Sequence, residues 1–151
     1  MTGRSIRSRA PTASSANVHK VMVANYGDNT LPELLIRRTL FRFGLRFRKN
    51  ARPIESLRCV ADIVFPKRRV CVFVDGCFWH GCPKHFKCPK TNSAWWSEKI
   101  EANRVRDRRQ TKRLQRAGWT VIRVWEHDLI AKRISIVSNR VRNAVMSRAS
   151  H

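Results

Sequence analysis

Apolar residues recur at the three- and four-residue spacing of an amphipathic helix in three stretches of the chain. The first helix is predicted over residues 30–43, because Thr30 can act as its N-cap, Glu33 follows as in a capping box, and Gly44 can end it. The last helix is predicted over residues 129–147.

The longest predicted helix, over residues 93–117, carries polar residues on its apolar face. Ser93 can cap this helix, Gly118 can end it, and its interior lacks Gly and Pro. Asn103 and Asp107 fall on the same face as the apolar anchors. These anchors are Trp96, Ile100 and Leu114. Polar side chains on a face that is otherwise apolar indicate a functional role, which makes the helix a candidate part of a site.

Three short apolar runs, at 59–65, 70–74 and 119–125, predict buried strands. The basic turn 66–69 separates the first two runs, which predicts a hairpin. Strands in the middle with helices before and after them predict an α/β domain with a central mixed sheet flanked by helices. Its 151 residues suit one such domain.

The net charge of the chain predicts that this domain binds a polyanionic partner. Lys and Arg number 32 against 10 Asp and Glu, which gives a net charge of +22. Basic residues occur in every segment, which favours a folded surface that neutralises several phosphates. Nucleic acid is the predicted partner; a ribosome-like protein or a merely solvated basic face is the alternative.

The ends and the cysteines of the chain indicate its compartment. The sequence has no apolar run of about 18 residues and no signal peptide, so we expect a soluble protein with no membrane partner. Residues 1–27 contain no acid and predict a flexible basic arm before a domain over 28–148; an organellar transit peptide is the alternative. An odd count of five cysteines favours metal chemistry in a reducing compartment over a disulfide framework.

Residues 74–85 crowd metal ligands, an acid and aromatic residues into one loop. Cys77, Cys82 and His85 offer the soft and borderline ligands of a tetrahedral Zn²⁺ site within nine residues. The fourth ligand is either Cys88, which is near in sequence, or His127, which follows the third strand. Such a closed site would be structural; reactive or merely buried thiols are the alternative. Two further cysteines lie in apolar runs and are interpreted as small hydrophobic residues: Cys59 and Cys71.

Carboxylates and a histidine near this loop indicate a second centre. Asp62 lies in an apolar strand, where a carboxylate must be paired with an arginine or bind a metal. Asp75 ends the next strand and could share a hard cation such as Mg²⁺ with Asp62. Glu33 could join them, or be only a capping residue. His80 is left over by the zinc ligands and is a candidate general base.

Phe78 and Trp79 are adjacent aromatic residues on this loop of a basic protein. They are either core residues or wedges that insert between base pairs, and we favour the wedges because neighbouring loop side chains seldom both reach a core.

Five blocks of the sequence together resemble one family. They are N-T-L-P-E (29–33), A-D-I-V-F (61–65), V-F-V-D-G-C-F-W-H-G-C-P-K-H (72–85), W-W-S-E-K-I-E-A-N-R-V-R-D-R-R (95–109) and G-W-T-V-I-R-V-W-E-H-D-L (118–129). In these blocks the chain is similar to the very short patch repair endonucleases, bacterial enzymes that nick DNA beside the thymine of a T:G mismatch. The resemblance implies a restriction-endonuclease-like fold with a structural zinc site.

The resemblance also implies roles for single residues. Asp62 would ligate catalytic Mg²⁺ together with the main-chain carbonyl of Val74, and His80 would activate the attacking water. Glu33 would hold metal-bound water, and Asp107 would help to organise the site. The wedge residues would be Phe78 and Trp79, with Met22 of the N-terminal arm. The structural zinc positions would be Cys77, Cys82, His85 and His127.

The chain departs from the family pattern in three places. The segment V-M-V-A-N-Y-G-D before Asn29 is less basic than expected for an arm that enters DNA, which bears on the role of Met22. Asp75 stands where some members have a histidine that supports the reaction, which leaves it as a metal ligand or a helper of the leaving group. The loop length at His85 differs by one residue from some members, so Cys88 is a substitute ligand. The family further implies a monomer in the bacterial cytoplasm, associated with the nucleoid through DNA and with other mismatch-repair proteins as candidate partners.

Two other functions fit the residues. A restriction-type endonuclease would cut matched DNA, and a non-catalytic zinc-stabilised module would only bind DNA. The acids and His80 argue against the second, because binding alone does not require them.

Overall fold

The computed structural model describes residues 30–130 and 132–148. In this part the chain forms a four-stranded sheet with helices on both faces. The helices are α2 (Leu31–Arg42), α3 (Ser93–Arg116) and α4 (Ile134–Ser147), with short 3₁₀ turns at Pro66–Arg68 and Glu126–Leu129. The strands are β1 (Arg48–Ala51), β2 (Ala61–Phe65), β3 (Val70–Asp75) and β4 (Thr120–Trp125).

The sheet is mixed, and its strands lie in the order β1-β2-β3-β4. Strand β2 pairs antiparallel with both β1 and β3, and β3 pairs parallel with β4. The parallel pair requires a crossover, which α3 provides. The predicted α/β class, the mixed sheet and the β2–β3 hairpin are therefore confirmed.

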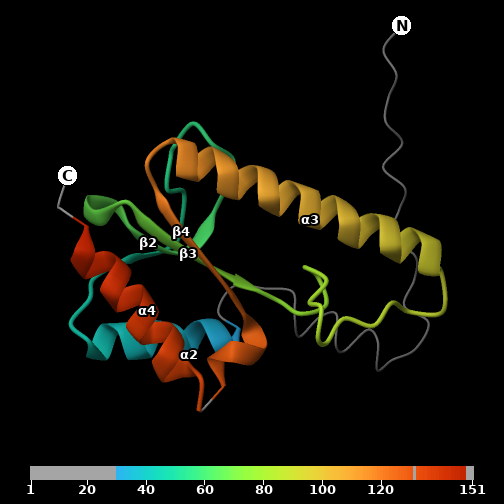
Figure 1. The fold of residues 1–151 in the computed structure, drawn as a ribbon, viewed down its shortest axis with the longest axis horizontal. Coiled ribbons are helices and arrows are strands. Elements are labelled where there is room, and N and C mark those ends of the chain that lie inside the picture. Colours follow the sequence, from blue (N-terminus) through green and yellow to red (C-terminus); the bar gives the residue numbers. More distant parts are fainter. Residues whose placement is uncertain (1–29, 131, 149–151) are drawn as a thin grey trace, which may run out of the picture.

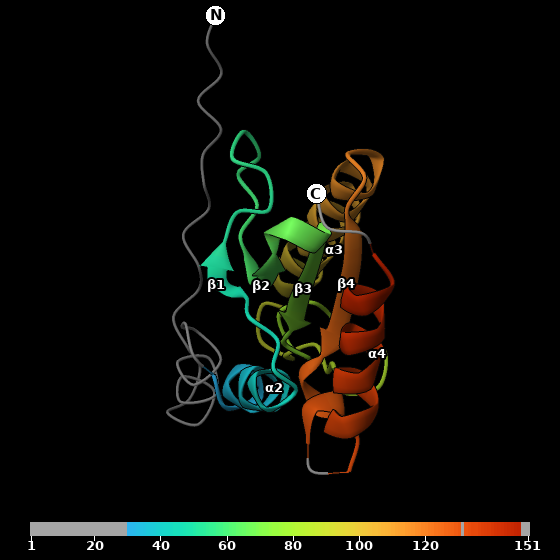
Figure 2. The same ribbon diagram turned by 90° about the vertical axis from the view of Figure 1, so that its left-hand side faces the viewer.

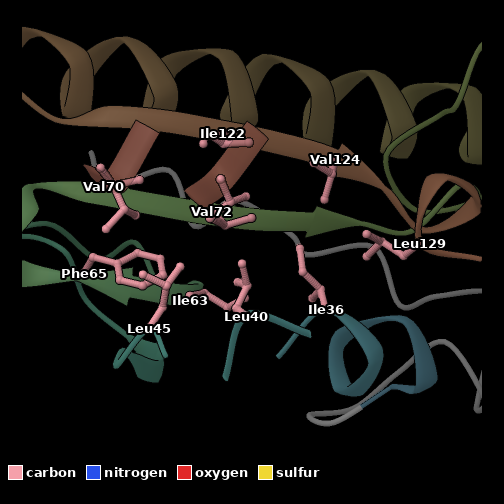
Figure 3. Close-up of a cluster of buried hydrophobic side chains, with 12 residues drawn as sticks. Ile36, Leu40, Leu45, Ile63, Phe65, Val70, Val72, Ile122, Val124 and Leu129 are labelled. Carbon is pink, nitrogen blue, oxygen red and sulfur yellow. The ribbon is translucent and has the colours of Figure 1, made fainter. Parts of the chain in front are cut away.

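Three layers result, with α3 on one face of the sheet and α2 with α4 on the other (Figures 1 and 2). The larger core lies between the sheet and α2 and α4, where Ile36 and Leu40 of α2 meet Ile63, Val72 and other strand residues (Figure 3). A smaller core lies under α3. It contains Cys59, Ala61, Val64, Cys71, Phe73 and Leu114. The period of two along β3 and β4 supplies residues to both cores.

The cysteines of the smaller core are small buried residues, as predicted. Cys59 is 4% exposed and Cys71 is not exposed. Burial raises the pKa of the Cys71 thiol to about 12, which leaves it protonated and unreactive at neutral pH.

The predicted helix caps are confirmed only in part. Thr30 occupies the N-cap position of α2 as predicted, but its side chain makes no capping hydrogen bond to a described residue. Glu33 does not complete a capping box either; it is buried and its Oε2 lies 3.5 Å from Nη2 of Arg37. Asn92, not Ser93, occupies the N-cap position of α3, in a left-handed conformation. Gly118 ends that helix as predicted, with φ of +83°.

Two elements differ from the sequence prediction. Strand β1 was not predicted, because Arg48–Ala51 reads R-K-N-A and carries no apolar alternation. It is an edge strand that is held in the sheet by its pairing with β2. The last helix begins at Ile134 rather than 129, since Glu126–Leu129 forms a separate 3₁₀ turn. Among the described residues, no helix is both long enough and apolar enough to cross a membrane.

Candidate active site and metal centre

The loop after β3 is fixed against α3 by the polar residues of that helix. The Asn103 side chain donates to the carbonyl of Trp79 at 2.9 Å. Arg104 donates to the carbonyl of Gly81 at 2.5 Å. Gly81 has φ of +62°, and a Cβ there would lie 2.6 Å from the Ile100 side chain, so only glycine fits this close approach. The polar stripe predicted on α3 therefore exists to hold this loop.

A cluster of soft and borderline donors lies at one side of the loop. Its ligand atoms all lie within 4.8 Å of one another, and the residues are Cys77, Cys82, His85 and His127. The four sulfur-to-nitrogen separations run from 3.2 to 3.9 Å, and the two histidine Nδ1 atoms lie 3.2 Å apart. Tetrahedral coordination with the usual bond lengths would give about 3.6 Å and about 3.3 Å. The four donors therefore have the spacing of a tetrahedral metal site.

The register of the parallel strands explains why His127 joins this cluster. Asp75 of β3 pairs with Trp125 of β4, so Cys77 and His127 each follow two residues after a paired position. Cys77 is held further by its N–H, which donates to Glu126 Oε1 at 2.8 Å. Cys88 is exposed, and its Sγ lies 3.5 Å from the Ser93 carbonyl oxygen. The structure thus brings His85 and His127 into the cluster and leaves Cys88 outside it.

A second cluster lies between the loop and α3, and it centres on His80. Nδ1 of His80 lies 2.5 Å from Asp107 Oδ2 and 3.6 Å from Asp75 Oδ1. Both aspartates are buried, with the side chains of Asp75 and Asp107 10% and 12% exposed. Arg123 donates to both oxygens of Asp75 at 2.8 Å and lies 3.4 Å from Asp107 Oδ1. An imidazole, two carboxylates and a guanidinium therefore form one connected network.

The charges of this network stabilise each other. Burial raises the pKa of the Asp107 carboxyl. The hydrogen bond and charge of His80, together with the charge of Arg123, lower it by more than burial raises it, so the net pKa lies below the ordinary value. Burial lowers the pKa of Arg123, whereas the hydrogen bond and charge of Asp75 raise it above its ordinary value. Asp107 is ionised and Arg123 is charged at neutral pH.

Asp62 lies at the same end of the sheet, across the hairpin from the end of β3. Its Oδ2 accepts a hydrogen bond from the N–H of Val74 at 2.7 Å. Within residues 30–130 and 132–148 its carboxylate makes no ion pair, so the alternative of a salt bridge to an arginine is not found there. Arg37 donates instead to the main-chain oxygen of Asp62 at 3.2 Å. Burial raises the pKa of Asp62 to about 6, and the charge of Glu33 contributes to the rise. Asp62 is thus an acid without an ion pair among the described residues, although the charge of Arg37 lowers its pKa in part.

The adjacent aromatic residues of the loop are half-buried and pack on each other. The ring centroids of Phe78 and Trp79 lie 5.3 Å apart, and Phe78 lies 5.3 Å from Trp96 of α3. Phe86 completes the group, 5.7 Å from Phe78. The two aromatics therefore belong to a larger aromatic cluster at the loop. The third predicted wedge, Met22, lies outside the described residues, as does the arm over 1–27.

Comparison with known proteins identifies the family of the chain. The model of the family described as DNA mismatch endonuclease Vsr matches residues 12–87, half of the chain. A type II nicking enzyme of Lentzea aerocolonigenes, V.NaeI, is 42% identical over 129 residues, which cover 84% of this chain and 78% of that protein. The chain belongs to the Vsr family.

Two other Vsr-like relatives extend the comparison. The type II nicking enzyme V.XorIIP of Xanthomonas oryzae pv. oryzae is 41% identical over 116 residues, or 76% of this chain and 82% of that protein. The DNA mismatch endonuclease Vsr of Escherichia coli K12 is 47% identical over 84 residues, or 55% of this chain and 52% of that protein. The resemblance read from the sequence blocks is thus confirmed at the level of the family.

Sequence reasoning about this Vsr-family chain missed two residues of the site, Arg123 and Trp96 in its aromatic role. A signal for Arg123 was present, because it interrupts the apolar run of β4. A charged residue at a buried strand position needs an acidic partner. Trp96 was assigned only to the apolar face of α3, and its packing against Phe78 depends on how the loop folds back.

Proposed function

We propose that this protein is a metal-dependent DNA endonuclease that nicks one strand of a duplex beside the thymine of a T:G mismatch. The observation that carries the proposal is the His80–Asp107 pair beside Asp62, in a chain of the Vsr family. The net charge of +22 supports a DNA substrate, because basic surface neutralises phosphate.

His80 acts as the general base. Its Nδ1 faces Asp107 at 2.5 Å, which favours the tautomer with the proton on Nδ1 and leaves Nε2 free. Nε2 then takes a proton from the water that attacks the phosphorus atom, and Asp107 stabilises the imidazolium that forms. The buried Asp107 also fixes the orientation of the ring, which reduces the entropy cost of the step.

Mg²⁺ fits the oxygen donors at the other side of the site. Asp62 is an acid without an ion pair among the described residues, and its pKa of about 6 reflects burial and the charge of Glu33. A hard divalent cation would relieve that cost, with Asp62 and the Val74 carbonyl as its protein ligands and Glu33 nearby. When bound, Mg²⁺ would supply positive charge that stabilises the phosphate in the transition state.

Zn²⁺ fits the other cluster. Two cysteines and two histidines with tetrahedral spacing leave no open position, which is typical of a structural site. Burial raises the pKa of the Cys77 thiol to about 12, so a metal cation is needed to favour the thiolate. His127 Nε2 lies 3.5 Å from Asp128 Oδ1, and such an outer partner orients a ligating imidazole. The zinc would hold both ends of the loop that carries His80.

Phe78 and Trp79 are the proposed wedge at the mismatch. They lie on the loop two and one residues before His80, and they are only half-buried. Packing on Trp96 and Phe86 would keep them rigid while they enter the duplex. Met22 would enter from the N-terminal arm. Asn103 supports the wedge by its hydrogen bond to the Trp79 carbonyl.

A nicking enzyme of matched DNA is the second candidate. The relatives at 41% and 42% identity are named type II nicking enzymes, without mention of a mismatch, and this favours the second candidate. Nicking assays on a panel of intact duplexes separate the two candidates. The duplexes contain T:G, each other mismatch, or only matched pairs, and each is assayed with and without Mg²⁺. Preference for T:G in Mg²⁺ supports the proposal, and equal nicking of matched DNA favours the second candidate. No cleavage of any duplex by protein that binds DNA would overturn both.

A further inference from the structure

The guanidinium of Arg123 is fully engaged on the α3 side of the sheet. Its Nε and Nη2 donate to the two carboxylate oxygens of Asp75 at 2.8 Å each. Its Nη1 donates to Thr111 Oγ1 at 3.3 Å, and the group lies 4.5 Å from the centroid of the Phe73 ring. A two-point contact of this kind fixes the orientation of a carboxylate as well as its charge.

Two carboxylates face the same nitrogen of His80, and Arg123 contacts both. Asp75 Oδ1 and Asp107 Oδ2 lie 3.6 and 2.5 Å from Nδ1 of the imidazole. Two buried carboxylates at one site repel each other unless a cation offsets their charge. Arg123 is the arginine that contacts both, since it lies 2.8 Å from Asp75 and 3.4 Å from Asp107. Arg106 also lies 3.4 Å from Asp107 Oδ1, but its side chain is more exposed and makes no ion pair with Asp75.

The same contacts argue against a metal ion between these groups. The ligand atoms of Asp75, His80 and Asp107 lie within 4.8 Å of one another, which is close enough for a shared cation. A metal ion bound to Asp75, however, would have to compete with a largely buried guanidinium that already takes both oxygens. Asp62, which has no ion pair among the described residues, is the better ligand for a hard cation.

We propose that Arg123 is a positioning residue, which holds Asp75 and Asp107 so that the two carboxylates orient His80 for the reaction. Asp75 is then a positioning residue as well, not a ligand of the catalytic metal and not a helper of the leaving group. This inference rests on the proposed role of His80 as the base. It gives Asp75 a different task from either of those suggested by the family position alone.

Three variants test the proposal in steady-state nicking of a T:G duplex: Arg123→Gln, Asp75→Asn, and the two combined. Arg123→Gln leaves the charge of Asp75 uncompensated beside His80, and it should lower kcat by about 100-fold with KM for DNA within about threefold. The combined variant removes that stray charge. It should therefore regain about tenfold in kcat over Arg123→Gln alone.

The magnesium dependence separates a positioning role of Asp75 from ligation. Asp75→Asn should lower kcat by about tenfold and leave the Mg²⁺ concentration for half-maximal nicking within about threefold of wild type. A rise of tenfold or more in that concentration would make Asp75 a ligand and overturn the proposal. A combined variant no more active than Arg123→Gln would also overturn it.

A readout without catalysis guards against a purely structural explanation. In magnesium-free, zinc-loaded protein, the hydrogen-bonded imidazole N–H of His80 should give a far-downfield proton resonance, identified by its loss in His80→Gln. The resonance should disappear in Arg123→Gln and return in the combined variant. Persistence of the signal in folded Arg123→Gln would contradict the proposal. If Arg123→Gln does not fold, Arg123→Lys replaces it, because lysine keeps the charge but loses the two-point contact.

Arg140→Gln is the matched control, since Arg140 is exposed on α4 and makes no ion pair with a described residue. It should change none of these readouts. The inference and the proposed function fail separately. Normal nicking by His80→Gln would overturn the proposed function. If wild type nicks the T:G duplex but Asp75→Asn does not restore activity to Arg123→Gln, only the role of Arg123 is overturned.

Discussion

The two clusters beside the loop contain similar numbers of ligand atoms but balance their charge in different ways. In the cluster of Cys77, Cys82, His85 and His127 the donors point at one another, and no side-chain cation of the described residues contacts them. In the cluster of His80 the carboxylates are offset by Arg123. The first arrangement could hold a metal ion, whereas the carboxylates of the second are already paired with an arginine. Proximity of ligand atoms alone would not separate the two.

Asp62 belongs to neither cluster, and its charge presents a third case. Its carboxylate is held by the Val74 N–H but has no counter-ion among the described residues. Burial, with the charges of Glu33 and Asp75, raises its pKa to about 6. Under the proposed function, Mg²⁺ supplies the positive charge at this carboxylate.

The largest effect is expected at this acid. Asp62→Asn keeps the hydrogen bond from Val74 but loses the charge that would bind Mg²⁺, so nicking of a T:G duplex should fall by about 10³-fold or more. DNA binding, measured by fluorescence anisotropy, should remain within a few fold of wild type. The control is Glu55→Gln, which removes an exposed acid that belongs to neither cluster. Nicking by Asp62→Asn at the wild-type rate would remove Asp62 from the active site.

The next largest effect tests the cysteine and histidine cluster as a metal site. Cys82→Ser should lose bound zinc and lower the free energy of unfolding by at least about 3 kcal/mol, or roughly 10 °C in Tm. Zinc is measured by elemental analysis and Tm by circular dichroism. Cys88→Ser is the matched control, because Cys88 is exposed and outside the cluster. Equal zinc and equal Tm in the two variants would refute the comparison between clusters.

The pH dependence of stability gives a third, smaller effect. Because the pKa of Asp62 is raised from 3.8 to about 6 in the folded protein, the folded state binds the proton more tightly between these pH values. Stability is therefore lost as pH rises through this window, by on the order of 2 kcal/mol at pH 7. Asp62→Asn avoids the loss.

The measurement is thermal unfolding of zinc-loaded, magnesium-free protein at pH 4 and at pH 7. The variant should match wild type at the lower pH and exceed it at the higher one. Added Mg²⁺ should raise the Tm of wild type and not that of Asp62→Asn. A variant that is less stable at pH 7 would mean that the Asp62 charge is already compensated within the protein.

The smallest effect concerns the outer face of α3, which contrasts with its inner face. There, Arg109, Lys112, Arg113 and Arg116 make no ion pair with described residues, and Arg109 and Arg113 line a groove with Leu57 and Cys59. Repulsion along this face weakens the helix slightly, and a DNA backbone would offset it. Arg109→Gln with Arg113→Gln should lower the slope of log Kd against log salt by about 1 per lost contact. Arg140→Gln, on α4, should leave the slope of the wild type unchanged.

The sequence allowed much of the fold to be predicted, because helices and central strands bury one face and so show a period. Strand β1 has no such signal, since Arg48–Ala51 is polar and owes its conformation to pairing with β2. Single site residues such as Asp62 and His80 could be selected because their chemistry is out of place in an apolar run or a tight loop.

Partnerships across the sheet could not be predicted in the same way. The choice between Cys88 and His127 depends on the pairing of Asp75 with Trp125, which exists only after the crossover through α3 has formed. The contact of Arg123 with Asp75 has the same origin, because the two residues are 48 positions apart in the chain. Local spacing contains no information about that register.

The most direct test of the proposed function is the single-turnover nicking rate of His80→Gln and wild type on the same T:G duplex, with protein in excess and the cut site mapped on a sequencing gel. Wild type should cut one strand beside the mismatched thymine. His80→Gln should bind the duplex equally well and cut it about 10³-fold more slowly, because the base is lost. Cutting by His80→Gln at the wild-type rate, or cutting by wild type away from the mismatch, would contradict the proposed function.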